Sequence, residues 1–239
     1  MGTDIHVWVE VKDEIGLWEP THAEFPAPYD EDETIGHFIP SKWDADNPMR
    51  AENVRRHGQT MWMGRNYSLF GILADVRNGR GFAGIDMGDP LSVIAAPRDL
   101  PEDVSPLVRA AACEYQGHDT SWLTLEEIDD FDWEQTATLR GVVDWEAFLK
   151  WKKDGARPYE YCGSISGRSI VTMSADMAIS IVDCDHTVVQ LYPGAEVHVQ
   201  VEWHEPYRDL CREFLQDFVP VLRTLGEPQD VRMVFWFDS

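Results

Sequence analysis

The amino-acid sequence predicts an α+β fold, with residues 1–239 forming a single domain around a mostly antiparallel sheet. Segments that alternate apolar and polar residues lie near both ends of the chain, at Asp4–Val11 and Val231–Phe237, and a third lies at Val197–Trp203. This period of two is typical of half-buried β-strands. Because helical patterns lie between the strands, we expect the three strands to share one sheet on which helices pack.

The first strand has an unusual polar face. Its apolar face is formed by every second residue from Ile5 to Val11, and the opposite face carries Asp4, His6, Trp8 and Glu10. Asp4 and His6 lie about 7 Å apart along such a strand and point the same way. A carboxylate and an imidazole in this arrangement can converge on one metal ion or on one bond to be cleaved.

The stretch from residue 19 to residue 64 shows no periodicity, contains five prolines and includes an acidic run at Asp30–Glu33. A segment of this length without periodicity is typical of a functional lid or an insertion. Helices are predicted beyond it, over Asn66–Asn78 and from Ser105 to Tyr115, because both segments have the apolar spacing and the end residues of helices.

The second half of the chain mixes helices and strands. A capping box at Thr124–Glu127 begins one helix, and Asp144 caps another. Residues Tyr159–Gln190 are expected to form β-hairpins. A long helix is expected over Glu205–Leu225, kinked or restarted at Pro220.

The composition limits the classes of function. The chain has 43 acidic and 20 basic residues, a formal net charge of −23, and 44% hydrophobic residues. Such a chain is not disordered, and its charge disfavours binding to the phosphate backbone of nucleic acids. The sequence has no apolar run of membrane-spanning length and no signal peptide, and its four cysteines are scattered, so we expect a cytoplasmic protein without a membrane partner.

Motifs distributed over nearly the whole chain occur together: Met1–His6, Arg65–Phe70, Pro97–Pro101, His118–Leu123 and Val231–Asp238. This combination resembles a family of bacteriophage and prophage proteins that begin with M-G-C-D-I-H, with Thr3 standing here in place of the cysteine. The resemblance implies a phage setting, and therefore a host cytoplasm, and implies no particular mechanism.

Polar residues on two of the predicted strands form a candidate metal site. Its ligands would be Asp4, His6, His198, Glu202 and His204. Imidazole and carboxylate ligands suit one divalent ion, Zn, Mn or Mg, which would polarise a phosphate or activate water. The alternative is a sheet face covered by helices, in which these side chains make structural hydrogen bonds.

A second candidate site precedes the capping box. It consists of His118, Asp119, Ser121 and Trp122. The first three are candidate catalytic residues and Trp122 a candidate base-stacking ring, at a helix N-terminus where anions bind readily. The alternative is an ordinary helix entry with Trp122 as a core anchor.

Arg65, Asn66 and Tyr67 begin another predicted helix and form a candidate substrate-binding group. Arg65 could hold a phosphate, and Tyr67 could stack on a base. Helix capping explains Asn66 without any ligand.

Together these features predict an enzyme, such as a metal-dependent hydrolase, that acts on a nucleotide or another phosphorylated small molecule, for example a host immune signal. Asp4 and His6 would be metal ligands or a base, and His118 the general acid–base. The alternative is a non-catalytic binding protein that sequesters a nucleotide or blocks a host protein through its acidic surface. Turnover of a nucleotide distinguishes the enzyme, and recovery of intact ligand distinguishes the binding protein.

Overall fold

The computed structural model describes residues 2–21, 23, 25–26, 34–35, 61–62, 65–115, 117–153, 155–184 and 191–238. The α+β class is confirmed, and the predicted single domain is divided into two compact units, each with a sheet of its own. The first unit comprises Met1–Val76, Ser92–Trp133 and Leu210–Ser239, and the second comprises Arg77–Leu91 and Glu134–Asp209. Most of the predicted insertion at residues 19–64 lies outside the described residues.

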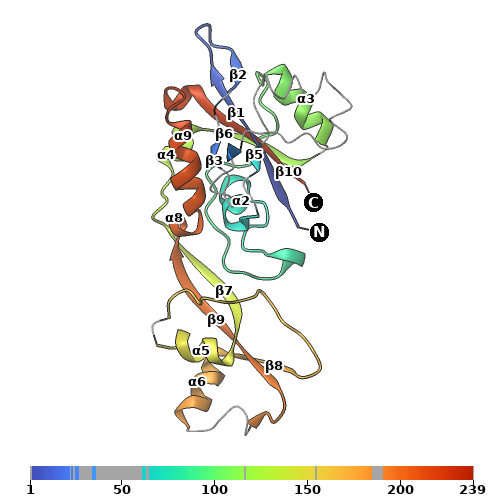
Figure 1. The fold of residues 1–239 in the computed structure, drawn as a ribbon, viewed down its shortest axis with the longest axis vertical. Coiled ribbons are helices and arrows are strands. Elements are labelled where there is room, and N and C mark those ends of the chain that lie inside the picture. The colour runs from blue at the N-terminus through green and yellow to red at the C-terminus, as the bar shows by residue number, and fades with distance from the viewer. Residues whose placement is uncertain are drawn as a thin grey trace. The chain divides into compact units, whose positions relative to one another are not determined.

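The main sheet of the first unit is antiparallel and joins strands from both ends of the chain (Figure 1). Its order is β2 (Trp18–Pro20), β1 (Asp4–Lys12), β10 (Val231–Asp238) and β6 (His118–Thr124). The short strand β5 (Met61–Trp62) also pairs with β1, and β3 (Phe25–Pro26) pairs separately with β4 (Thr34–Ile35). The prediction that the terminal strands share a mostly antiparallel sheet is confirmed, and β10 lies between β1 and β6.

One face of this sheet packs on helix α2 (Tyr67–Ala74). The side chain of Asn66 accepts a hydrogen bond from Leu69 N at 3.0 Å and so caps the helix. The ring of Phe70 meets the ring of Phe237 edge-on, with 5.2 Å between the centroids. The predicted helix start at Asn66 is therefore confirmed, and this contact joins α2 to the central strand.

The opposite face, which looks polar in the sequence, is largely aromatic and buried. Helix α3 (Pro106–Tyr115) packs there, and its Val108 lies in one cluster with Trp8, Val234 and Trp236. Trp8 is 3% exposed and Trp236 is fully buried. Because large aromatic side chains contribute much of the energy of a core, this face forms a second core of the unit.

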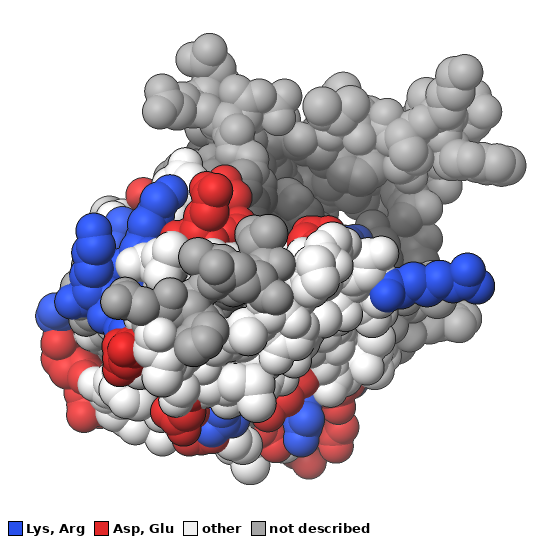
Figure 2. All heavy atoms as spheres, turned by 90° about the horizontal axis from the view of Figure 1, so that it is seen from below, with Lys and Arg blue, Asp and Glu red and all other residues white. Residues whose placement is uncertain are grey.

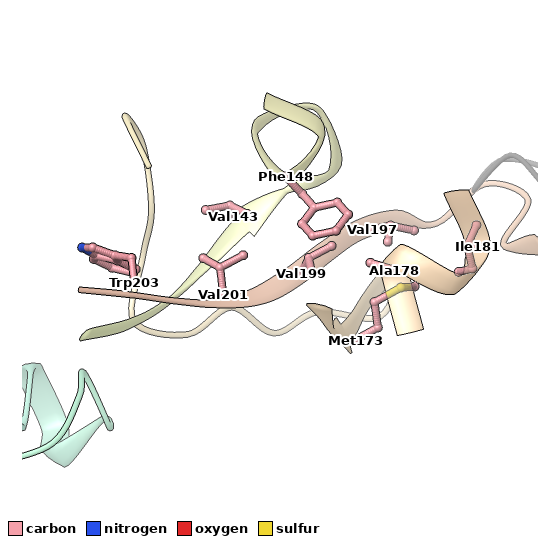
Figure 3. Packing of buried hydrophobic residues seen from close by; sticks show 9 residues of the cluster. All are labelled: Val143, Phe148, Met173, Ala178, Ile181, Val197, Val199, Val201 and Trp203. Carbon is pink, nitrogen blue, oxygen red and sulfur yellow. The ribbon is translucent and has the colours of Figure 1, made fainter. Parts of the chain in front are cut away.

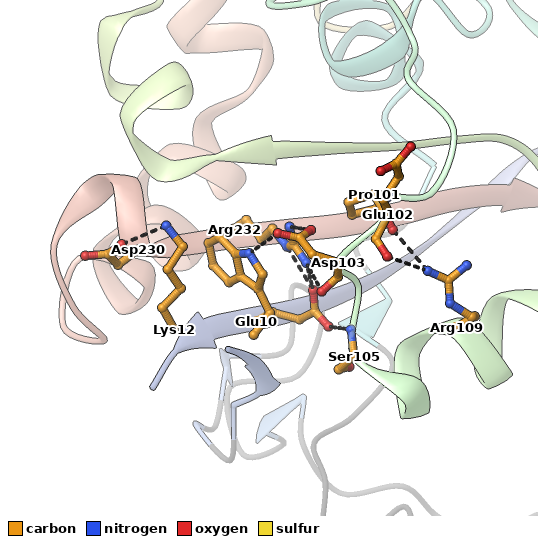
Figure 4. A network of polar contacts seen from close by, with 10 residues as sticks. Glu10, Lys12, Pro101, Glu102, Asp103, Ser105, Arg109, Asp230 and Arg232 are labelled. Carbon is orange, nitrogen blue, oxygen red and sulfur yellow. Dashed lines mark hydrogen bonds and ion pairs between the residues drawn. The ribbon is translucent and has the colours of Figure 1, made fainter. Parts of the chain in front are cut away.

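Glu10 and Arg232 form a buried ion pair on this same face (Figure 4). Arg232 Nε donates to Glu10 Oε2 at 2.9 Å, and Arg232 Nη1 donates to Asp103 Oδ1 at 2.7 Å. The guanidinium carbon lies 3.9 Å from the ring centroid of Trp18, and Glu10 Oε1 accepts a hydrogen bond from Ser105 N. Buried charges persist only with such pairing, which explains why a strand can carry Glu10 on a buried face.

Helix α4 (Leu125–Asp130) begins with the predicted capping box. Thr124 Oγ1 accepts a hydrogen bond from Glu127 N at 3.2 Å, and Glu127 Oε2 accepts one from Thr124 N at 2.9 Å. These reciprocal bonds satisfy two backbone groups that the helix start would otherwise leave open. Single 3₁₀ turns lie at Phe82–Gly84 and Pro228–Asp230.

The long helix predicted over Glu205–Leu225 is shorter and irregular. Strand β9 continues to Pro206, and helix α8 (Tyr207–Leu210) follows it. A π-helical turn at Phe214–Phe218 precedes α9 (Val219–Leu222). Pro220 has no amide N–H to continue α-helical hydrogen bonding, which accounts for the irregular turn just before it.

The second unit contains the sheet β7–β9–β8. Strand β9 (Glu196–Pro206) lies in the middle, antiparallel to β7 (Thr136–Asp144) and parallel to β8 (Ile170–Ser174). The expectation that Val197–Trp203 shares a sheet with the terminal strands is therefore wrong. Alternation identifies the two faces of a strand but not its neighbours. In addition, β7 is not among the strands that the sequence predicts.

Helices α5 (Trp145–Trp151) and α6 (Ala175–Asp183) contribute to the core on one face of this sheet. Phe148 of α5 and Ala178 of α6 pack with alternate residues of β9 (Figure 3). The hairpins expected over Tyr159–Gln190 are wrong for the described part. Ser174 caps α6, and its apolar residues then follow helical spacing.

Candidate functional site

The ends of β1 and β10 bring together four charged side chains, named here the terminal cluster: Asp4, His6, Arg65 and Asp238. Asp4 and Asp238 occupy directly opposed positions of the two strands. Arg65 Nε and Nη2 donate to the two carboxylate oxygens of Asp4, at 2.6 and 3.0 Å. His6 Nε2 lies 3.0 Å from Asp238 Oδ2. The structure thus places Asp4 and His6 on one face, as predicted, and adds Arg65 and Asp238 to them.

The terminal cluster is open to solvent on one side and bounded by the core on the other. The side chains of Arg65 and Asp238 are 56% and 47% exposed, whereas that of His6 is 16% exposed. The imidazole of His6 stacks on the indole of Trp236, with centroids 6.1 Å apart and planes 17° apart. The hydrogen bond to Asp4 raises the pKa of Arg65. The cluster therefore combines a positioned imidazole with a permanently charged guanidinium.

The two residues predicted to act with Arg65 serve the fold. Asn66 caps α2 with its side-chain oxygen, and its Nδ2 donates to Leu210 O at 2.7 Å. The hydroxyl of Tyr67 accepts a hydrogen bond from Thr3 N at 3.3 Å. The bond from Thr3 connects the start of α2 with the residue before β1, and the bond to Leu210 connects it with the end of α8. Both bonds hold the neighbouring Arg65 at the cluster.

A second imidazole–carboxylate pair lies at the beginning of β6. His118 Nδ1 lies 2.7 Å from Asp119 Oδ2, and the side chains are 44% and 52% exposed. Adjacent residues of a regular strand point to opposite faces. Here the pairing with β10 shifts register between Phe235 and Phe237, and Asp119 has a left-handed conformation with φ of 50°. This bulge brings the two neighbouring side chains together, and bulges of this kind are frequent next to active sites.

The two imidazoles belong to opposite faces of the sheet. His6 stacks on Trp236, whereas the ring of His118 lies 6.2 Å from that of Phe237. Consecutive residues of a strand point to opposite faces, so the end of the sheet separates the two rings. The His118–Asp119 pair is therefore a site of its own and not a part of the terminal cluster.

Ser121 and Trp122 have structural partners in the first unit. Ser121 is 1% exposed, and its Oγ accepts a hydrogen bond from Arg98 N at 3.1 Å. The guanidinium carbon of Arg98 lies 4.5 Å from the ring centroid of Trp122, and Arg98 also forms an ion pair with Glu127. These contacts explain both residues without a nucleophile or a stacked base.

The other polar residues of the predicted metal site lie in the second unit. His198, Glu202 and His204 occupy one face of β9, in a different sheet from Asp4 and His6. Pairing of the two strands, on which the predicted ligand set depends, does not occur, because β1 pairs with β10 and β9 pairs with β7 and β8.

The carboxylate and one imidazole on β9 have partners on its own face of the sheet. Glu202 Oε2 accepts a hydrogen bond from Arg140 Nε at 3.0 Å, and His198 Nε2 lies 3.0 Å from Glu196 Oε1. His204 is exposed beside them. Over the described ranges, no three His, Cys, Asp or Glu side chains gather as a group that could hold a metal ion.

Asp238 is the residue of the terminal cluster that the sequence interpretation missed. The signal was present in the last strand, where Arg232, Trp236 and Asp238 share the face opposite the apolar one. Antiparallel pairing of the two terminal strands then places Asp238 opposite Asp4.

Comparison with known proteins finds no match, so the functional proposal rests on the geometry of the terminal cluster. The chain matches no protein-family model, and neither a curated protein nor a solved structure matches it. In the part of the chain that the structure describes, no helix is long and apolar enough to cross a membrane.

Proposed function

We propose that the terminal cluster is the site of an enzyme that acts on a nucleotide or another phosphorylated small molecule. The observation that supports this proposal is the placement of two pairs on one face, His6 with Asp238 and Arg65 with Asp4. One pair supplies a proton-transfer group and the other a cation for phosphate. The resemblance to phage and prophage proteins supports an infected cell as the setting of this activity and a host signalling nucleotide as a candidate substrate.

In the proposed reaction, His6 transfers a proton to or from the reacting group. The Asp238 carboxylate beside Nε2 orients the ring. Stacking on Trp236 further fixes the plane of the imidazole. A ring held in this way needs little reorganisation when substrate arrives, which is the advantage of a rigid site.

Arg65 is the proposed phosphate ligand. Its guanidinium presents two parallel N–H groups, which Asp4 accepts in the described structure. A phosphate offers the same bidentate geometry with a larger charge, so it competes with Asp4 for these donors. Binding would leave Asp4 beside the substrate as a second carboxylate. The His118–Asp119 pair on the other face is a further candidate for proton transfer.

A binding protein that acts through its acidic surface is the second candidate. Its support is the way the described arginines are used: Arg98, Arg140, Arg157, Arg208 and Arg223 each pair with a carboxylate of the same chain. These pairs leave the excess of 43 acidic over 20 basic residues unchanged. Such a surface attracts a basic host protein.

A nucleotide panel with matched variants tests the proposed enzyme. The native chain should convert at least one nucleotide, and His6→Gln and Arg65→Gln should each lower the rate by at least about a hundredfold. His204→Gln is the matched control, because it removes an exposed histidine of the second unit. Intact nucleotide recovered from every incubation would overturn the enzyme proposal and favour the binding protein.

A further inference from the structure

Strand β8 is an edge strand of the three-stranded sheet in the second unit, and no described strand pairs with its outer side. Ser169 O accepts a hydrogen bond from Glu196 N at 2.7 Å, and alternate residues of a parallel strand point their backbone groups to the same neighbour. The N–H and C=O of Ile170, Thr172 and Ser174 therefore point away from β9. Two of these groups are engaged locally, because Ile170 N donates a turn bond to Gly167 O, and Ser174, as the N-cap of α6, uses its C=O for the first bond of that helix. The N–H and C=O of Thr172, the N–H of Ser174 and the C=O of Ile170 are left facing the outer side of β8, where no other described strand pairs.

Strand β8 lacks three of the usual protections of an edge strand, namely charge, proline and a bulge. Natural edge strands are commonly short, charged, broken by proline or covered by another element. Strand β8 has the sequence Ile-Val-Thr-Met-Ser, without charge, proline or bulge. Thr172 and Ser174 are exposed, so the edge is accessible at its centre and at its end.

The charge pattern around β8 differs from that of the rest of the chain. Residues 163–182 contain one basic and one acidic residue, Arg168 and Asp176, in a chain of which 26% is charged and whose net charge is −23. Figure 2 shows one face of the molecule, on which acidic and basic side chains lie around an area of uncharged ones. Two copies of so acidic a chain repel one another, and the electrostatic repulsion between the contacting surfaces is weakest where those surfaces carry no charge. This neutral stretch is therefore suited to contact with a second copy.

We infer that β8 pairs with β8 of a second copy of this chain, antiparallel across a two-fold axis at Thr172. The outward N–H and C=O of Thr172 would exchange hydrogen bonds with Thr172 of the other copy. Ser174 N–H would reach the C=O of Ile170 in the same way. Such a pairing uses one surface twice, as closed dimers do, and it removes the open edge by joining two sheets.

The helix after β8 adds apolar surface to the same contact. Met177 in the first turns of α6 is 52% exposed, although the helix packs on the sheet through Ala178 and Ile181. A two-fold pairing of the β8 edges brings the two α6 helices toward one another on the same side of the joined sheet. Covering Met177 would then contribute hydrophobic energy that the backbone hydrogen bonds of one strand pair do not supply.

The oligomeric state of the full chain tests this inference. Light scattering during size-exclusion chromatography should give twice the chain mass for the native protein. Thr172→Lys places two like charges opposite each other at the axis and should raise the dissociation constant by at least about tenfold, with recovery at high salt. Gln200→Lys is the matched control, because it adds the same charge to an exposed position of the central strand. A monomeric native protein, or a dimer unaffected by Thr172→Lys, would overturn the inference.

Cross-linking tests the register independently of stability. In a chain whose exposed cysteines, Cys113, Cys162 and Cys184, are replaced by serine, Thr172→Cys should form a disulfide-linked dimer on mild oxidation. Directly opposed residues that exchange hydrogen bonds lie about 5.5 Å apart at Cα, within disulfide range. Gln200→Cys in the same chain should remain monomeric on a denaturing gel. Absence of the Thr172→Cys cross-link in folded protein would contradict the proposed axis.

Discussion

Asp4 and Asp238 face each other across β1 and β10, and each carboxylate has a partner of its own. Arg65 binds Asp4, and His6 contacts Asp238. Like charges in directly opposed positions destabilise an antiparallel pair. The two pairs are therefore linked through the sheet, because removing the Arg65 guanidinium leaves the two opposed carboxylates to repel each other.

Replacing Arg65 with glutamine should lower the free energy of unfolding. Arg65 pairs with Asp4, which lies opposite Asp238, and without the positive charge of the guanidinium the two carboxylates repel one another. Urea denaturation at low salt measures the loss, which should shrink at high salt as the charges are screened. Adding Asp4→Asn to Arg65→Gln should restore part of the stability. If the double variant is less stable than Arg65→Gln alone, repulsion between the two carboxylates is not the cause.

The buried pair of Glu10 and Arg232 predicts a larger effect. Arg232→Met should cost about 3–5 kcal/mol, because it leaves the Glu10 carboxylate buried without a partner. Adding Glu10→Leu to Arg232→Met should recover much of this loss, because no buried charge then remains. Arg223→Met is the surface control and should cost about 1 kcal/mol or less, since Arg223 pairs with Asp129 at the surface. Equal losses for Arg232→Met and Arg223→Met would contradict the importance of burial.

Glu127 predicts a pH dependence of stability. Burial acts to raise the pKa of Glu127, but hydrogen bonds from Arg98 and from Thr124 outweigh it and hold this pKa below its ordinary value of 4.5. A carboxylate with a lowered pKa in the folded state stabilises the protein above its unfolded pKa and loses that contribution as the pH falls through the folded value. The native chain should therefore exceed Glu127→Gln in stability near pH 6, and the difference should decrease below pH about 4.5.

Urea titrations of both proteins across this pH range measure the difference. Glu126→Gln is the control, because Glu126 is exposed in the same helical turn. A difference between the native chain and Glu127→Gln that stays constant down to acid unfolding would rule out the linkage.

The cysteines should differ in reactivity. Burial raises the pKa of the Cys211 thiol to about 12, whereas Cys113, Cys162 and Cys184 are exposed. Alkylation requires the thiolate and access to it, so Cys211 should remain unmodified in the folded protein at neutral pH. Mass spectrometry after brief treatment with iodoacetamide should show modification at the exposed cysteines only, and at all four after denaturation. Rapid native labelling of Cys211 would show that this part of the core opens readily.

Local sequence signals predicted the elements that depend on near neighbours. The capping residues Asn66, Thr124 and Asp144 all cap helices as expected, because a cap is decided within four residues. The alternation of β1 and β10 likewise gave their faces.

Elements that depend on distant partners could not be predicted in this way. Strand β6 has a bulge at Asp119, which disrupts the alternation by which a strand is recognised. The partners of β9 are β7 and β8, and the alternation of β9 fits any neighbour equally well. The ligand set for a metal was built on that unknown partner, so it combined residues from two different sheets.

The position of β10 between β1 and β6 has a consequence for synthesis on the ribosome. Strand β10 follows all the other described strands of its sheet in chain order, and yet it forms hydrogen bonds with both of its neighbours, β1 and β6. Until its residues leave the exit tunnel, β1 and β6 have no partner between them, and the apolar side chains that β10 covers remain accessible to chaperones. Every residue of the second unit precedes Leu210 in the chain. All residues of the second unit are therefore synthesised before β10, which the sheet of the first unit needs to form.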